Sequence, residues 1–339
     1  MLNKKFSAVL IDPDIIEELE CDFIGINSIA LPALYNLLSR KNTALLDCKI
    51  LHEKIKSKLG ETFLNFEMQQ IFEFCDGLEI LRPLGDYVDN AVTVIKSIDL
   101  PRLFGERFER LYANAIMMPS CNVDDVLGMY YSKLPPFDSL DEDFEIYDAL
   151  MLSTFIDYAD KHPDEQFLVV SDNDDWKYIL ECVKNVTVVY SVEEVTGKWL
   201  PENGFARQLY KRFQQKITER IKYLVNNYTY LVGDCAPGAE MKIDVDSVRV
   251  YNQTMSPLQV TDKVASYRVV VDMDIYGKYK RACGMFKDDR WQSIGDANAS
   301  AALEVEITYD KQDVANTAQV TAVKIVDRGA IVVYIDDED

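Results

Sequence analysis

Residues 144–176, FEIYDALMLSTFIDYADKHPDEQFLVVSDNDDW, constrain the fold of this chain more than any other stretch. An acidic pair, Glu145 and Asp148, opens the stretch, and apolar residues then recur at helical spacing over 149–159. A short polar turn leads into the apolar run 167–170, which stops abruptly at the polar cluster SDNDDW. A fully apolar run of this length after a helix is typical of a buried parallel strand. Because ligands collect at the carboxyl ends of such strands, we expect the helix start and the strand end to face one crevice.

Strand and helix patterns alternate over the first 190 residues. An apolar run at residues 6–11 ends in Asp12 and Pro13, which is typical of a buried strand with a carboxylate at its carboxyl end. The same reasoning predicts strands at 43–48 and 186–190, and helices at 29–38, 49–59, 63–79, 86–98, 103–117, 123–134 and 177–183. This order predicts an α/β fold with a mostly parallel central sheet.

The pattern changes after residue 200. Residues 204–228 place apolar side chains on one stripe of a long amphipathic helix. Beyond them apolar and polar residues alternate, as in 267–275 and 303–307, which predicts strands with one solvated face. We therefore expect an α/β domain over residues 1–200, a linking amphipathic helix over 201–228 and a small β-rich C-terminal domain over 229–339.

Composition narrows the classes of function. The chain has 36 Lys and Arg against 57 Asp and Glu, a formal charge of -21, which is unusual for a protein that grips nucleic acid non-specifically. Seven scattered cysteines without a CxxC pair favour a reducing compartment over a disulfide or zinc framework. With two histidines, a histidine-based metal site or a Ser-His-Asp triad is not expected. No apolar stretch approaches the roughly 20 residues of a membrane span, and we expect a cytoplasmic protein without membrane contact.

Acidic residues stand at expected strand ends or first helical turns in four places. They are Asp12, Glu53, Asp148 and the cluster 172–175, in which Asp172, Asp174 and Asp175 accompany Asn173. Oxygen-only clusters suit hard cations such as Mg²⁺ or Mn²⁺. Such ions can activate water and stabilise the leaving oxygen in phosphodiester hydrolysis, so this chemistry needs no histidine.

Each of these residues also has a purely structural interpretation. Asp12 before Pro13 could be a turn aspartate, and Glu53, flanked by lysines, could belong to a solvated helix face. Asp148 could be a first-turn carboxylate stabilised by the helix dipole. The segment SDNDDW could form an N-cap and turn, since Ser, Asp and Asn all cap helices well.

Four ordered segments resemble motifs of the PIN-domain nucleases. LIDPDII resembles their opening strand, and LLDCKILHEKI resembles their second acidic motif, in which Glu53 takes the acidic position. PPFDSLDEDFEIYDALML is similar to a PIN-like branch catalogued as a domain of unknown function. LVVSDNDDW resembles the closing motif, with Asn173 at its usual acidic position and Asp175 before the aromatic residue. The resemblance covers residues 1–195.

The resemblance implies a PIN-like domain with metal-dependent phosphodiesterase activity, most often on single-stranded RNA. Its metal-binding carboxylates would be Asp12, Glu53 and Asp148, with Asn173 as an uncharged ligand and Asp172 or Asp175 supplying the missing charge. Catalysis would then depend on Asp12, Glu53, Asp148 and Asp175, with Mg²⁺ or Mn²⁺ as cofactor.

Two rival hypotheses remain open. The PIN-like fold could serve as an inactive scaffold whose acidic surface meets a basic partner, or the chain could be a toxin or defence effector held inactive by a regulatory protein. Two basic segments could contact single-stranded nucleic acid: the helix 211–222, and residues 276–291, where aromatic and basic side chains interleave.

Overall fold

The computed structural model describes residues 6–25, 28–61, 100–133, 137, 146–226, 230–232, 240–282, 292–326 and 331–335. The chain divides into two compact units, Met1–Val195 and Thr196–Asp339, each with its own β-sheet. The long helix α11 (Asn203–Asn226), which we expected to link two domains, is grouped with the second unit in this division.

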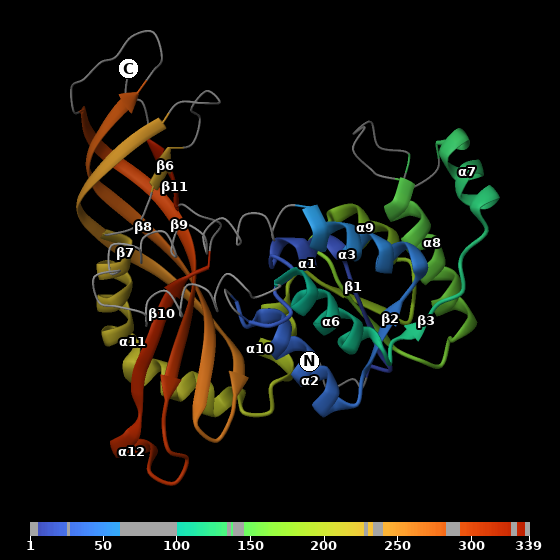
Figure 1. Cartoon of the computed structure of the whole chain (residues 1–339), viewed down its shortest axis with the longest axis horizontal. Helices are drawn as coiled ribbons and strands as arrows, with labels where there is room; N and C mark the ends of the chain where they lie inside the picture. Colours follow the sequence, from blue (N-terminus) through green and yellow to red (C-terminus); the bar gives the residue numbers. More distant parts are fainter. Residues whose placement is uncertain are drawn as a thin grey trace, which may run out of the picture. The chain divides into compact units, whose positions relative to one another are not determined.

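A five-stranded, wholly parallel sheet forms the centre of the first unit, in the order β3-β2-β1-β4-β5 (Figure 1). Every residue of β1 and β4 is buried, as expected for strands that are covered on both faces. The mixed α/β fold with a parallel sheet is therefore as the sequence predicts. The strands are β1 (Ala8–Ile11), β2 (Ala44–Asp47), β3 (Ile116–Met117), β4 (Phe167–Val170) and β5 (Val186–Val189).

Helices follow the strands of this sheet and supply the rest of the core. Helix α3 packs against α1, α6 and α8, and α7 packs against α8. Large aromatic side chains fill the interior, and Phe155 of α8 lies edge-on to Phe167 of β4 with ring centroids 6.0 Å apart. The helices are α1 (Pro13–Glu18), α2 (Ala30–Lys41), α3 (Lys49–Glu61), α6 (Leu100–Tyr112), α7 (Val123–Ser132), α8 (Ile146–Lys161), α9 (Asp174–Leu180) and α10 (Val192–Trp199).

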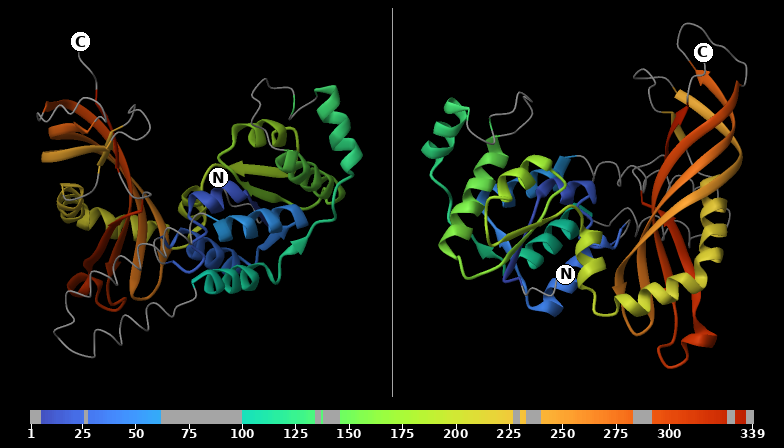
Figure 2. Two further views of the ribbon diagram at one scale, coloured as in Figure 1. Left: turned by 45° about the horizontal axis from the view of Figure 1, so that its top comes forward. Right: turned by 180° about the vertical axis from the view of Figure 1, so that it is seen from behind.

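The second unit contains a largely antiparallel sheet in the order β6-β11-β9-β8-β7, with β10 also paired to β9. Of its described pairings, only that of β6 with β11 is parallel. Helix α11 packs against β7 and β10 (Figure 2), and the Tyr267 hydroxyl donates a hydrogen bond to the Ala206 carbonyl. The elements are β6 (Tyr230–Val232), β7 (Glu240–Val260), β8 (Val264–Ala282), β9 (Gln292–Thr308), α12 (Val314–Thr317), β10 (Gln319–Ile325) and β11 (Ile331–Ile335).

One local prediction was wrong. The helix expected at 103–117 ends at Tyr112, and residues 116–117 instead form the edge strand β3, which pairs with β2. The expected first strand does end before Pro13, which occupies the first turn of α1, a position where its missing N–H is no loss. The helices expected at 63–79 and 86–98 lie outside the described residues.

No helix in the described parts of the chain is long and apolar enough to cross a membrane.

The packing of α8 on β4 gives a stability prediction. Replacing Phe155 by Ala removes a fully buried ring, so we expect the free energy of unfolding to fall by about 3–5 kcal/mol. The matched control is Asp160→Ala, an exposed position on the same helix, which should change stability by less than about 0.5 kcal/mol. Chemical denaturation of both variants measures the difference, and equal midpoints would contradict the described core.

Candidate active site

Asp12 lies at the carboxyl end of β1, the middle strand of the parallel sheet. It is the N-cap of α1, and its Oδ1 accepts a hydrogen bond from the Asp14 backbone N–H at 3.0 Å. Its Oδ2 accepts a hydrogen bond from the Ser171 hydroxyl at 2.6 Å. The residue is 1% exposed, and this burial raises the pKa of Asp12 to about 6, although both hydrogen bonds oppose the rise.

The pairing of β1 with β4 brings Asp12 to Ser171, which is 159 positions away in the sequence. Ile11 is in register with Val170, and the Asp12 N–H donates to the Val170 carbonyl at 2.9 Å. Since parallel strands end at the same edge, the residues that follow both strands meet there. The end of β4 and the end of β1 therefore meet at one edge of the sheet through this Asp12–Ser171 pair.

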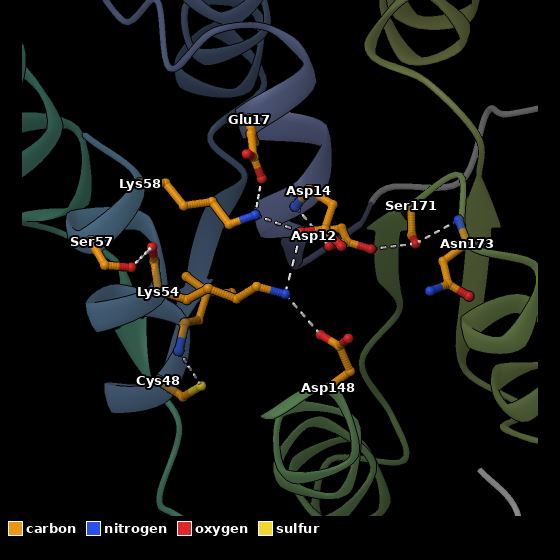
Figure 3. A network of polar contacts seen from close by, with 11 residues as sticks. Asp12, Asp14, Glu17, Cys48, Lys54, Ser57, Lys58, Asp148, Ser171 and Asn173 are labelled. Atoms are coloured by element: carbon orange, nitrogen blue, oxygen red, sulfur yellow. Dashed lines mark hydrogen bonds and ion pairs between the residues drawn. The ribbon is translucent and has the colours of Figure 1, made fainter. Parts of the chain in front are cut away.

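Asp148 lies in the first turn of α8 and is 6% exposed. The ammonium group of Lys54, on α3, lies 3.1 Å from Asp148 Oδ1 and 3.3 Å from Asp14 Oδ1 (Figure 3). Burial lowers the pKa of Lys54, but the nearby carboxylates of Asp148 and Asp14 outweigh it and the net pKa is raised. One lysine thus joins a first-turn residue of α1 to a first-turn residue of α8.

Helix α3 presents lysines to this cluster. Its buried stripe is Leu51, Ile55 and Leu59, whereas Glu53 is exposed. Among the contacts of the described residues, none joins Glu53 to Asp12 or Asp148. For Glu53, the structure therefore favours the solvated helix face, and Lys54 is the residue of α3 that reaches the carboxylates.

Asn173 is the N-cap of α9. Its side-chain oxygen accepts hydrogen bonds from the N–H groups of Asp175 at 2.8 Å and Trp176 at 3.4 Å. Asp172 and Asp175 are exposed, and no contact in the described part of the chain joins them to Asp12. The structural interpretation of SDNDDW as an N-cap is thus correct, and the amide oxygen expected to bind metal is occupied by the helix it starts.

Sequence reasoning missed a second polar pair at the same sheet edge. Asp47, the last residue of β2, is 1% exposed, and its Oδ2 lies 2.7 Å from Nδ1 of His52. Burial raises the pKa of Asp47, while the bond to His52 opposes the rise. The His52 ring packs on Phe108 at 4.8 Å, and its Nε2 lies 3.7 Å from Glu109 Oε1. The signal was present: Asp47 lies near the end of the strand predicted at 43–48, much as Asp12 directly follows the apolar run 6–11.

The donors near Asp12 suit a hard cation in kind. Asp12, Asp14 and Asp148 offer carboxylate oxygens, the ligands that Mg²⁺ and Mn²⁺ prefer. The Lys54 ammonium group lies between Asp14 and Asp148, where a metal ion would lie, so this position accommodates positive charge. With the side chains as they lie, no three His, Cys, Asp or Glu within the described ranges are arranged to hold a metal ion.

The basic segments found in the sequence have other contacts. On α11, the Arg212 guanidinium donates to the carbonyls of Val314 and Ala315. An open groove of about 500 Å³ lies between α11 and β10. Its lining from α11 includes Lys216, Glu219, Arg220 and Tyr223. In the segment 276–291, residues 283–291, with Phe286, Lys287, Arg290 and Trp291, lie outside the described residues.

No protein-family model matches this chain, and no curated protein matches it either. The resemblance to PIN-domain nucleases therefore stays a prediction.

The buried Asp12 carboxylate gives a pH prediction. Its pKa is raised from 3.8 to about 6, so ionising it costs more in the folded chain than in the unfolded chain. This cost is absent below about pH 4 and grows to about 3 kcal/mol by pH 7. The Asp12→Asn side chain does not ionise and carries no such cost. The free energy of unfolding of wild type should therefore fall by about 3 kcal/mol relative to that of the variant as the pH rises over this range.

Urea unfolding of both proteins in EDTA, at several pH values from 4 to 7, measures this difference. A difference that stays constant across the range would contradict the raised pKa of Asp12.

Proposed function

We propose that the chain is a metal-dependent nuclease that hydrolyses phosphodiester bonds in single-stranded RNA. The observation that carries the proposal is the meeting of Asp12, Asp14 and Asp148 in one network at the carboxyl edge of a parallel sheet. This edge is where open α/β sheets bind ligands. The four ordered segments that resemble PIN-domain motifs support the same activity and the preference for RNA over DNA.

Asp12 and Asp148 are the principal candidates for holding Mg²⁺ or Mn²⁺, with Asp14 as a third carboxylate in place of Glu53. The bound ion would supply activation of water and neutralisation of the leaving oxygen. Ser171 orients the Asp12 carboxylate through its 2.6 Å hydrogen bond, which leaves the other oxygen facing Asp14. Asn173 keeps α9 in place and so positions the end of β4.

The first test is cleavage of labelled single-stranded RNA and DNA with Mn²⁺, Mg²⁺ or EDTA. Wild type should cut RNA only with metal. Asp12→Asn and Asp148→Asn should each slow cleavage at least about 100-fold, because a carboxylate that holds the ion loses its charge.

Asp160→Asn is the matched control, since it neutralises an exposed aspartate on the same helix as Asp148 and should cleave like wild type. Circular dichroism must show that all variants are folded. Unchanged turnover in both Asp12→Asn and Asp148→Asn would contradict the nuclease assignment.

The second candidate function is an inactive PIN-like scaffold that binds a basic protein partner. Two observations favour it: Lys54 already neutralises the carboxylates, and the Asn173 oxygen is engaged by backbone N–H groups. The formal charge of -21 suits a basic partner. An effector kept inactive by a regulatory partner would use the nuclease chemistry once released.

Thermal unfolding in rising Mn²⁺ separates the two functions. A nuclease site should stabilise the fold by about 2.7 kcal/mol at 100 times the dissociation constant, and Asp12→Asn should remove this gain. If the chain is an inactive scaffold, the stability of wild type should not increase with Mn²⁺.

A further inference from the structure

Lys54 lies where two elements of the candidate site converge. Its side chain is 13% exposed, between the 9% of Asp148 and the 43% of Asp14, so Lys54 is largely buried between its two partners. The same Nζ contacts both carboxylates, at 3.1 and 3.3 Å (Figure 3). These are the contacts of a bridging cation, made by a group tethered to α3.

Lys58, one turn further along α3, provides a comparison. Its ammonium group lies 3.3 Å from Asp14 Oδ1 and also pairs with Glu17, both on α1. Of the lysines that the structure describes, only Lys54 bonds both Asp14 and Asp148. Lys58 therefore ties α3 to α1, whereas Lys54 also ties both to α8 at the proposed site.

The ammonium group of Lys54 and a bound metal ion would compete for the same oxygen atoms. An ion held by Asp148 and Asp14 would need the lone pairs that now accept from Lys54, and two cations this close repel strongly in a partly buried site. A fixed ammonium group also explains why three carboxylates lie in one network without being arranged to hold an ion in the described residues.

We propose that Lys54 is the resident cation of the Asp14–Asp148 pair, and that a divalent ion binds only by displacing its ammonium group. The inference rests on the nuclease function proposed above and makes Lys54 a positioning residue of that site. In the absence of metal, Lys54 holds the carboxylates together. In its presence, the energy needed to break these contacts lowers the affinity for the ion.

The experiment measures binding of Mn²⁺ alone by isothermal titration calorimetry. The variants are Lys54→Met, which removes the charge and keeps the apolar stem, and Lys54→Arg, which keeps the charge. Lys58→Met is the matched control, because it removes an equal charge from the same helix and a contact to the same Asp14. Unfolding midpoints in EDTA and in saturating Mn²⁺ are measured for each protein.

We expect Lys54→Met to bind Mn²⁺ at least about tenfold more tightly than wild type, a change of about 1.4 kcal/mol. Lys54→Arg should stay near wild type, and Lys58→Met should change affinity by a smaller factor. In EDTA, Lys54→Met should unfold at a lower temperature than wild type, and Mn²⁺ should restore the midpoint. Adding Asp148→Asn to Lys54→Met should remove the gain in affinity.

Binding of Mn²⁺ by Lys54→Met that is no tighter than in wild type would overturn the inference, as would an equal gain in Lys58→Met. If Lys54→Met does not fold, Lys54→Gln answers the same question, since its amide donates a hydrogen bond without carrying charge.

RNA cleavage, measured separately, distinguishes this inference from the function. Tighter Mn²⁺ binding by Lys54→Met without cleavage by any protein would support the resident cation and reject the nuclease. Metal-dependent cleavage by wild type, with an unchanged Mn²⁺ affinity in Lys54→Met, would support the nuclease and reject the resident cation.

Discussion

The pairing of β1 with β4 is the constraint on which the rest of the first unit depends. These two strands are adjacent in the sheet and distant in the sequence, and their register sets Ile11 against Val170. Apolar burial on both faces drives the pairing, because all eight residues of the two strands are inaccessible to solvent. The polar residues that follow each strand are carried to one edge as a consequence, where Asp12 accepts the hydrogen bond of Ser171.

A site of this kind opposes the stability of the fold that builds it. Taking the Asp12 carboxylate out of water is costly, which is why its pKa rises to about 6. The surrounding structure offsets part of the cost with two hydrogen bonds, and Lys54 balances the charge of the neighbouring carboxylates. Burying a paired charge is tolerable where burying an unpaired one is not. Groups whose pKa values are shifted by burial and nearby charges cluster at functional sites.

Much of the site could be predicted from strand ends and helix starts. Asp12 and Asp148 stood out because each adjoins an apolar run whose length indicates a buried element. The segment that contains Asn173 suited both a metal ligand and an N-cap, and the bonds to Asp175 and Trp176 show the N-cap. Lys54 escaped notice because it lies next to Glu53, and one position along a helix turns a side chain by about 100°.

The sequence by itself determined the α/β fold class, the buried strands β1 and β4, and the change to a β-rich texture after α11, because hydrophobic periodicity is a local property of the chain. The sequence could not predict the edge strand β3, because two residues show no periodicity and pair only because β2 lies beside them. Which side chains meet at the sheet edge was decided by the tertiary structure alone. Contacts such as Lys54 with Asp148, 94 positions apart, follow from strand register and helix packing, and neither is a local property of the chain.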